Sequence, residues 1–453
     1  MRIQAIGGTR CAEDLPTQTW SPGGAWSSGV DPALLQSVRP ADAPLEVVVV
    51  VEAVGLPHGM AATSRVRLYC KALASVGVSV RVLLTTVSET PPRVLNSEPR
   101  GVVDRTPFEY TTGSPVRAES FLGRRLVESR GVLVAVARLA ALRRNGHPVA
   151  VLAYVGTSRC SLRYVALTAA ARVMRIPVVL ELCEVPWTLI GDRRPWERAF
   201  SPLALTSGAI TISGFLTSWA NTEYASRQRD ATATEIPILV DVDEVRPSPQ
   251  PHAQQAVLYA ASSGYDDSLA FVLEAMRHVW KSEPRCRLVV TGIAPEELDR
   301  FLSERAFTSG ETAMVIGVGR VSREALLRLY ADASACLAPL FDDQRSRARF
   351  PTKIAEYAAA GRPIVTSSVG EVRRYLVDRT TAFIAEPDDP VAFGGKIAEA
   401  LSDSELAGAV GTRARGLAEE RFDYRVHAAR LHEALAGTLT SHVRRVRQRQ
   451  GSR

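Results

Sequence analysis

Short apolar runs separated by amphipathic stretches repeat along most of the chain. The run LEVVVVVEAVG (45–55) is typical of a strand buried on both faces. A helical stretch (63–77) follows it, and then the apolar run VSVRVLLTT (78–86). The same order recurs in PVAVLAYV (148–155) and IPVVLELCE (176–184). Alternation of this kind predicts β–α–β units around a parallel sheet.

A second series of strands and helices begins after a stretch rich in proline and polar residues (236–256), which is typical of a linker. Two successive α/β domains are therefore expected, with ligands beyond the carboxyl ends of their strands. The predicted boundaries are a flexible N-terminal extension (1–44), an N-terminal Rossmann-like domain (45–236), a linker (237–256), a C-terminal Rossmann-like domain (257–415), a helix packing back on the N-terminal domain (416–442) and a basic tail (443–453).

Composition and charge narrow the class of protein. The 453 residues exceed what one hydrophobic core usually serves, and 46% hydrophobic with 23% charged residues is ordinary for a globular protein. The net charge of +7 is dispersed outside the arginine-rich tail, which favours a phosphate-bearing ligand or an anionic membrane over nucleic acid. The six cysteines show no metal-site spacing, and neither a signal peptide nor a transmembrane run is visible. We expect a cytoplasmic protein. Peripheral contact with the inner face of the membrane is compatible with this expectation.

The segment FPTKIAEYAAAGRPIVTS (350–367) carries candidate chemistry. Its pattern predicts a helix from Pro351 to Ala360, stopped by Gly361, with Lys353 and Glu356 on one face. The pair is either a solvated ion pair, stabilising the helix by ~0.2–0.5 kcal/mol, or part of a ligand site.

This segment resembles the nucleotide-sugar-binding segment of retaining glycosyltransferases of family 4, in the branch with a Pro-x-Lys-x-x-Glu-Tyr motif. ITISGFLTSWA (210–220), IPILVDVDEVRP (236–247) and AFIAEPDDPVAFGGKIAEALSD (382–403) resemble further family segments in the family's order. The resemblance spans roughly residues 45–435. It implies the GT-B fold: two Rossmann-like domains whose parallel sheets face a deep inter-domain cleft.

The resemblance also assigns roles in the C-terminal domain. It implies that Glu356 holds the donor ribose hydroxyls, while Lys353 binds the diphosphate and acts in catalysis. The donor site is further expected to include Gly370, Glu371 and Ser262. Donor binding is expected to need neither a metal nor a cofactor.

The chain departs from the family pattern at two places. Ala348 stands where the family's first Glu is expected, although the branch that this chain resembles also lacks that residue. The loop AASSGYDDS (260–268) has no Gly-Arg turn and carries Asp266 and Asp267, whose charges would repel a diphosphate. Either Arg345, Arg347 or Arg349 supplies the missing positive charge, or the donor binds weakly; the third possibility is a solvated charge run without a ligand. Arg345 and Arg349 are counted among the donor-site candidates.

In the N-terminal domain the loop PHGMAATSR (57–65) matches the family's glycine loop. Gly59 is expected to face the donor, and His58 either protonates the leaving group or caps the loop. Glu181 and Glu184 end a strand on the same side and either contact the acceptor or pack there. The segments 117–130 and 187–198 are amphipathic or rich in arginine and could lie on an anionic membrane.

The implied reaction moves a hexosyl or related group from a nucleotide diphosphate sugar to a hydroxyl acceptor, with retention. The acceptor is a cell-envelope polysaccharide, a lipid-linked saccharide or a natural product. The main alternative is a catalytically degenerate GT-B protein that binds a nucleotide sugar or a partner without turnover. A GT-B sugar-nucleotide epimerase is the second alternative, which the seven histidines, mostly outside the predicted loops, disfavour.

Overall fold

The computed structural model describes residues 45–92, 94–156, 161–190, 200–247, 255–260 and 266–451, with 440–451 as backbone. The predicted extension (1–44) and Ser262 lie outside the described residues.

The N-terminal domain is built on an eight-stranded sheet, counted over the described residues, in the order β3-β4-β2-β1-β5-β6-β7-β8. All neighbouring strands are parallel except β3 and β4, which form an antiparallel edge that the apolar pattern did not predict. The strands are β1 (Glu46–Val51), β2 (Ser79–Leu84), β3 (Arg100–Val103), β4 (Thr106–Tyr110), β5 (Val149–Tyr154), β6 (Val178–Leu182), β7 (Gly208–Thr211) and β8 (Ala233–Glu235). The helical elements are α2 (Ala61–Ser75), α3 (Phe121–Arg144), α4 (Leu162–Val173), η1 (Trp187–Leu189) and α6 (Gly214–Ser226).

The C-terminal domain is built on a six-stranded parallel sheet in the order β11-β10-β9-β12-β13-β14, again over the described residues. Its strands are β9 (Ala256–Ala260), β10 (Arg287–Thr291), β11 (Val315–Gly319), β12 (Ala335–Ala338), β13 (Ile364–Ser367) and β14 (Phe383–Ala385). The helices are α7 (Asp266–Ser282), α8 (Pro295–Glu304), α9 (Ser309–Thr312), α10 (Arg323–Asp332), α11 (Gln344–Ala348), α12 (Thr352–Ala359), α13 (Val372–Tyr375), α14 (Pro390–Ser402) and α15 (Ser404–Leu417). The prediction of two α/β domains around largely parallel sheets is confirmed.

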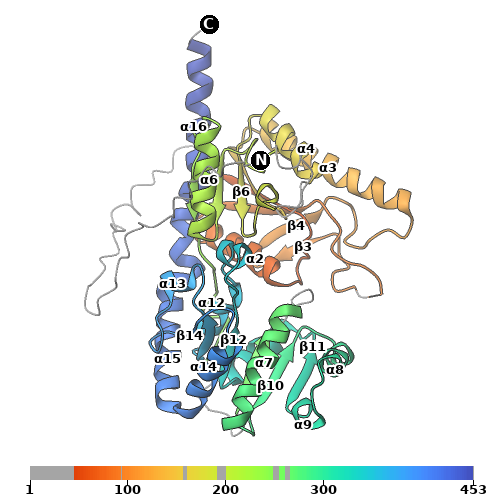
Figure 1. The fold of residues 1–453 in the computed structure, drawn as a ribbon. Helices are drawn as coiled ribbons and strands as arrows, with labels where there is room; N and C mark the ends of the chain where they lie inside the picture. Colours follow the sequence, from red (N-terminus) through yellow and green to blue (C-terminus); the bar gives the residue numbers. More distant parts are fainter. Residues whose placement is uncertain are drawn as a thin grey trace, which may run out of the picture. The chain divides into compact units, whose positions relative to one another are not determined.

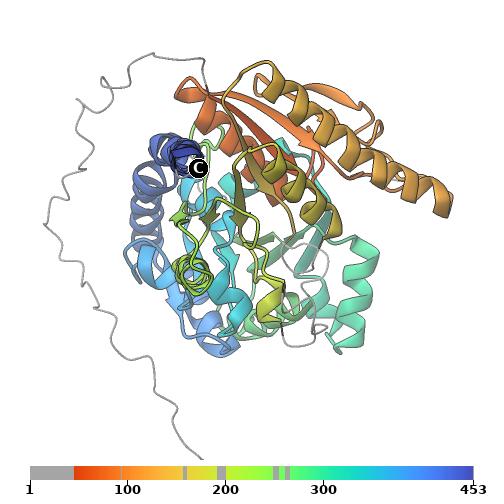
Figure 2. The ribbon, with the colours of Figure 1, turned by 90° about the horizontal axis from the view of Figure 1, so that it is seen from above.

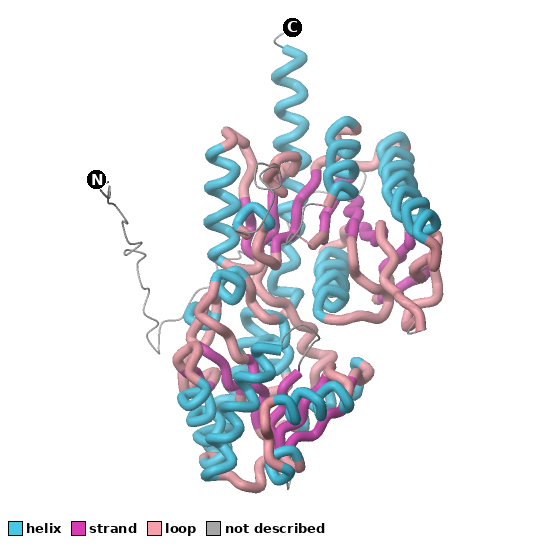
Figure 3. Tube along the Cα trace, turned by 45° about the vertical axis from the view of Figure 1, so that its right-hand side comes forward, coloured by secondary structure: helices cyan, strands magenta, loops and turns pink. Residues whose placement is uncertain are grey.

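Helices cover both faces of each sheet because alternate strand residues point to opposite sides (Figure 3). In β1, Val48 and Val50 pack in a core with α3, α4 and α6, whereas Val47 and Val49 pack in a second core that includes α2. In β9 the alternation separates Leu258, on the side of α12, from its neighbours Val257 and Tyr259, on the side of α7 and α14.

The chain crosses between the domains twice, and the two crossings lie side by side. The first crossing follows β8. The second runs through a π-helical turn, η2 (Ala418–Phe422), and a 3₁₀ turn, η3 (Tyr424–His427), into α16 (Ala428–Gly451). Val240 of the first crossing accepts a backbone hydrogen bond from Tyr424 N at 3.0 Å and donates one to Phe422 O at 2.8 Å. Helix α16 then packs on the N-terminal domain, where it contacts α2, β5 and β7.

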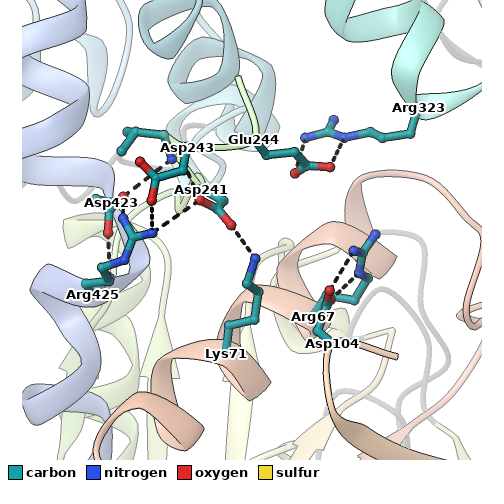
Figure 4. Close-up of polar contacts among 10 residues, drawn as sticks. Arg67, Lys71, Asp104, Asp241, Asp243, Glu244, Arg323, Asp423 and Arg425 are labelled. Atoms are coloured by element: carbon teal, nitrogen blue, oxygen red, sulfur yellow. Dashed lines mark hydrogen bonds and ion pairs between the residues drawn. The ribbon is translucent and has the colours of Figure 1, made fainter. Parts of the chain in front are cut away.

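Charged side chains brace these crossings (Figure 4). Asp241 pairs with Lys71 of α2, and Arg425 pairs with both Asp243 and Asp423. Glu244 pairs with Arg323, the first residue of α10, at 3.3 Å. The first crossing is therefore fixed to both domains by side chains as well as by backbone.

Both sheets share the strand order that places a topological switch point at their centre, between β1 and β5 and between β9 and β12. Ligands of such sheets bind beyond the carboxyl ends of the strands at the switch point. Contacts between the domains include those of Met60 with Arg320, Glu184 with Arg349, Ser213 with Ala348, and Gly214 with Glu371. All eight residues lie in segments that follow the carboxyl ends of strands. The two carboxyl edges therefore face each other.

Candidate donor and acceptor site

Lys353 lies at the switch point of the C-terminal sheet. Helix α12 begins just after Pro351, and this places the Lys353 ammonium at the last residue of β9, where Nζ donates to Ala260 O at 2.8 Å. The same ammonium lies 5.1 Å from the centre of the Tyr259 ring. Burial lowers the pKa of Lys353 to about 8, against the opposing effect of Glu356. The site thus holds a poorly hydrated cation at a position where it would attract a phosphate group.

Glu356 lies one turn further along α12 and is 8% exposed. Its Oε1 accepts from Arg323 Nη1 at 2.5 Å, and its Oε2 accepts from Tyr330 OH at 3.0 Å. A carboxylate offers about four lone-pair sites, so two protein donors leave capacity for hydroxyls of a ligand. Glu356 is therefore a buried, oriented acceptor beside a cation, and not a solvated member of a helix pair.

Gly370 and α11 pack against each other next to this pair. Gly370 has a φ of +53°, and a Cβ there would lie 3.2 Å from Ser346 O and 3.3 Å from Arg347 Cα. A side chain at this position would be strained by both the backbone angle and the contact. The loop after β13 is therefore held close to the segment that carries the predicted arginines.

Carboxylates pair with, or lie near, all three of the arginines considered as compensating charge. Arg349 pairs with Glu184 beyond β6 of the N-terminal domain, and Arg347 pairs with Asp342 at 2.8 Å. Burial raises the pKa of Glu184, and the Arg349 guanidinium opposes this shift. Arg345 is exposed on α11. The net positive charge of this loop is therefore smaller than the number of its arginines suggests.

Glu371 faces the other domain. Its carboxylate, 3% exposed, accepts from Gly214 N at 2.8 Å at the start of α6 and pairs with Arg374 at 2.7 Å. Burial raises the pKa of Glu371, and the Arg374 guanidinium opposes this shift. A carboxylate at a helix N-terminus is favourable because the free N–H groups and the helix dipole are positive there. The sequence placed Glu371 at the donor; in this structure its contacts join the two domains.

Asp266 and Asp267 are exposed in the first turn of α7, where the helix dipole favours negative charge. The serines expected beside them, Ser262 and Ser263, lie outside the described residues. The stabilising position of the aspartates gives them a structural role that does not involve a ligand.

The side chain of Asn96 holds the glycine loop of the N-terminal domain by hydrogen bonds to its backbone. Asn96 accepts from His58 N at 2.9 Å and donates Nδ2–H to His58 O, also at 2.9 Å, which leaves the His58 ring exposed. The neighbouring Met60 contacts Arg320, which follows β11. The loop therefore presents His58 and Gly59 beside the carboxyl edge of the C-terminal sheet.

We expect Gly59→Ala to lower the free energy of unfolding by about 1–3 kcal/mol. A Cβ at Gly59 would lie 1.9 Å from Thr63 Oγ1, which donates to Gly55 O at 2.8 Å, so the hydroxyl would have to leave its acceptor. Urea denaturation measures the change. Gly395→Ala is the control, because no atom lies within 4 Å of the added methyl group and the substitution sits in α14. Unchanged stability of Gly59→Ala would show that the loop is not packed in this way.

Glu181 and Arg65 are core residues. Arg65 Nε donates to Glu181 Oε1 at 2.6 Å, and both side chains are almost fully buried. Of the two possibilities for Glu181, contact with the acceptor or packing at the strand end, the structure shows packing, because the carboxylate lies beneath α2. Trp187, the first residue of the segment 187–198, is also buried, with Nε1 donating to Phe200 O at 2.8 Å, so its side chain does not face a membrane. Residues 191–198 of that segment lie outside the described residues.

Sequence reasoning missed three polar residues around the two switch points. Arg323 and Tyr330 orient Glu356, as described above. Glu52 follows β1 at the N-terminal switch point, where Ser161 Oγ donates to its carboxylate at 2.9 Å. Burial raises the pKa of Glu52, against the hydrogen bond from Ser161. A signal for Arg323 exists in SREALLRLY: a cation in the first turn opposes the helix dipole and so indicates an acidic partner.

Comparisons with known proteins agree with this geometry. Residues 254–403 match the family model described as "Glycosyl transferases group 1". A D-inositol 3-phosphate glycosyltransferase from Streptomyces avermitilis is 27% identical over 131 residues, which are 29% of this chain. The match spans only 27% of the length of that relative.

The fold of almost the whole described chain is similar to that of solved structures. The sucrose-phosphate synthase of Thermosynechococcus elongatus has a TM-score of 0.64 at 16% identity, over 87% of this chain and 100% of that chain. The Anabaena protein HepE in complex with UDP-glucose has a TM-score of 0.60 at 14% identity, over 86% of this chain and 99% of that chain. At such identities the likeness shows the fold, and the fold is GT-B.

Proposed function

We propose, from the match to group 1 glycosyltransferases and the GT-B fold, that this protein transfers a glycosyl group from a nucleotide diphosphate sugar to a hydroxyl acceptor with retention of configuration. One observation carries the proposal. A half-buried ammonium, Lys353, and an oriented carboxylate, Glu356, share one turn of α12 at the switch point of the C-terminal sheet. The bound UDP-glucose of HepE, a structure with the same fold, supports a nucleotide sugar as the donor.

Each residue has a part in the proposed reaction. Lys353 stabilises the negative charge that develops on the departing diphosphate, and Glu356 accepts hydrogen bonds from the ribose hydroxyls. Arg345 and Arg349 lie near the diphosphate in this proposal, although the Glu184 carboxylate offsets the charge of Arg349, and the backbone at Gly370 approaches the donor closely. With cations supplied by side chains, we propose donor binding that needs no metal ion.

Retention follows, in this proposal, from attack on the side that the diphosphate leaves. The incoming hydroxyl donates its proton towards the departing phosphate, so no protein nucleophile is required. His58, exposed on the braced loop, is the side chain of the N-terminal domain proposed to assist this proton transfer. Glu52 and Glu184, which lie just beyond β1 and β6, are carboxylates suited to acceptor hydroxyls.

A transfer assay tests the proposed function. The protein is incubated with UDP-, GDP-, ADP- and dTDP-sugars and a panel of hydroxyl acceptors, and release of nucleoside diphosphate is measured with and without acceptor. We expect one donor class to be consumed in an acceptor-dependent manner, with proton NMR showing the anomeric configuration of the donor in the product. An inverted product would contradict retention.

A second function is favoured by a specific observation. Ala348, at the position of the family's first Glu, is buried, and its backbone carbonyl accepts from Ser213 Oγ at 2.8 Å. Alanine supplies no carboxylate for the donor sugar, and this suits a protein that binds a nucleotide sugar without turnover. Saturable donor binding with no transfer to any acceptor and no donor hydrolysis would favour this alternative.

A further inference from the structure

Helix α3 is only partly supported by the domain to which it belongs. Gly131 marks the point where the helix crosses the carboxyl edge of the N-terminal sheet: a Cβ there would lie 2.3 Å from Thr85 O, just beyond β2. Thr111, just beyond β4, donates to Gly131 O at 2.8 Å. The buried residues of α3 are Gly131, Ala135 and Leu139, so none of residues 121–130 is buried. The first ten residues of α3 thus extend past the edge of the sheet, and one end of the helix projects from its neighbours (Figures 1 and 2).

The outer side of α3 carries large apolar side chains that no packing requires. Leu122, Leu126 and Leu133 lie within about 40° of one another around the helix axis, at 100° per residue. The inner face is itself apolar and is already packed against the sheet. Phe121 and the three leucines are between 62% and 73% exposed. A helix that is apolar on both sides is normally buried, and among the described residues the outer side has no partner.

Helix α4 adds an exposed leucine beside the projecting turns. Its cap residue Ser161 bonds Glu52 beyond β1, so α4 also begins at the carboxyl edge of the sheet. Leu162, its first residue, is 73% exposed. Arg163 pairs with Glu128 of α3 at 3.5 Å, which shows that the two helices lie side by side here. We call Phe121, Leu122, Leu126, Leu133 and Leu162 the α3 apolar surface.

Arginines surround the α3 apolar surface. Arg124, Arg125 and Arg130 lie in the projecting turns, and the Arg125 guanidinium stacks 5.3 Å from the centre of the Phe121 ring. Glu128 is the acidic side chain of these turns, and Arg125 and Arg163 both pair with it. The surface therefore combines exposed apolar side chains with an excess of positive charge.

We propose that the α3 apolar surface docks on an anionic lipid membrane. Leucine and phenylalanine side chains enter the acyl boundary while the arginines contact lipid phosphates, the arrangement of helices that lie in the plane of a membrane interface. A second copy of the chain fits this surface less well, because a twofold contact would bring the same arginines together. The proposal goes beyond the proposed function and does not depend on it.

Docking in this way has a consequence for the acceptor. The projecting turns lie at the edge of the sheet that also carries Glu52 and the His58 loop, so this edge would face the lipid headgroups. An acceptor hydroxyl presented at the membrane surface would then be within the protein's reach without leaving the bilayer.

Vesicle co-sedimentation of the full chain tests the proposal. We expect binding to vesicles of phosphatidylcholine with phosphatidylglycerol and at least about tenfold weaker binding to phosphatidylcholine alone, because each basic residue near an anionic surface contributes to affinity. Leu122→Gln with Leu126→Gln should weaken binding about tenfold or more. Arg125→Gln with Arg130→Gln should weaken it about tenfold and reduce its dependence on salt.

Matched controls lie in the C-terminal domain. Val391 of α14 is 54% exposed and Arg328 of α10 is largely exposed, and we expect Val391→Gln and Arg328→Gln to bind vesicles like the wild type. All four variants replace exposed side chains, so unchanged melting temperatures verify that each is folded. No binding to phosphatidylglycerol vesicles, or binding that the α3 variants leave unchanged, would overturn the proposal. So would a wild-type dimer that Leu122→Gln with Leu126→Gln dissociates without any vesicle binding, because the surface would then join two copies of the chain.

Discussion

Replacing Lys353 with methionine is expected to lower kcat for glycosyl transfer about 10²–10³-fold, the loss typical of removing one preorganised group that stabilises transition-state charge. Methionine retains most of the aliphatic volume beside Tyr259, so the fold should persist. The ammonium that meets the departing diphosphate is lost. Steady-state kinetics with the donor identified in the transfer assay measures the effect. Arg328→Met on exposed α10 is the control and should leave kcat unchanged.

The same residue gives donor binding a pH dependence. Burial lowers the pKa of Lys353 to about 8, and a bound diphosphate would favour the protonated form. Affinity for the nucleoside diphosphate should therefore be constant below pH 8 and fall as the pH rises above it, by up to tenfold per pH unit. Lys353→Met should remove this fall, which titration calorimetry over about pH 6.5–10 can show. A wild-type profile that is flat through this range would contradict the role of Lys353.

The effect of Lys353 on stability has the opposite dependence on pH: stability rises, whereas donor affinity falls, as the pH increases above about 8. The folded-state pKa of Lys353 lies below that of the unfolded chain, so the unfolded state binds more protons between these values. The contribution of Lys353 destabilises the protein below pH 8, and this penalty diminishes as the pH rises towards the unfolded-state pKa. A bound diphosphate removes part of the penalty at neutral pH.

Replacing Arg65 with methionine is expected to reduce the free energy of unfolding by about 3–5 kcal/mol, because a buried charge is left without its partner. Arg65 is the partner of Glu181, and its remaining N–H groups donate to Ile236 O at 3.0 Å and Pro237 O at 2.8 Å. The substitution removes the donor to both carbonyl groups, and it leaves the Glu181 carboxylate beneath α2 with the long hydrogen bond from Tyr69 OH, 3.3 Å, in place of an ion pair. Because Ile236 and Pro237 begin the first crossing, the orientation of the domains should loosen as well.

Arg67→Met on the same helix is the matched control. Its pair with Asp104 is partly exposed, so we expect a loss of no more than about 1 kcal/mol. Denaturant unfolding of the two variants compares them directly. Equal effects would mean that the Arg65–Glu181 pair is not buried in solution. Arg65→Met with Glu181→Leu, which removes both charges, should recover part of the stability.

The apolar pattern predicted the fold well because strands and helices are local features. Runs such as 45–55 and 148–155 became β1 and β5, and their alternation with helices was sufficient for two parallel sheets. The antiparallel strand β3 was missed because RGVV, with two of its four residues exposed, has no continuous apolar signal. The position of Lys353 and Glu356 on one helix after a buried strand was also visible from local spacing.

The partners of the site residues could not be predicted in the same way. Glu371 bonds Gly214 across 157 positions of sequence, and Arg349 pairs with Glu184 across 165. Such contacts depend on how the two carboxyl edges meet, which no local pattern records. The contact of Glu371 with the N-terminal domain and the carboxylate partners of Arg347 and Arg349 were therefore not predicted. The place of Glu371 and Arg349 at the donor stays a prediction.

The single most direct test is a thermal-shift panel with UDP, GDP, ADP and dTDP on the wild type and on Glu356→Gln. A ligand that binds the folded state raises the melting temperature by mass action, so we expect one nucleotide to stand out for the wild type. Glutamine preserves the shape of the side chain but loses the charge, and it should abolish or strongly reduce that shift. If no nucleotide shifts the wild type even at high concentration, or if Glu356→Gln responds like the wild type, then Lys353 and Glu356 do not form the donor site.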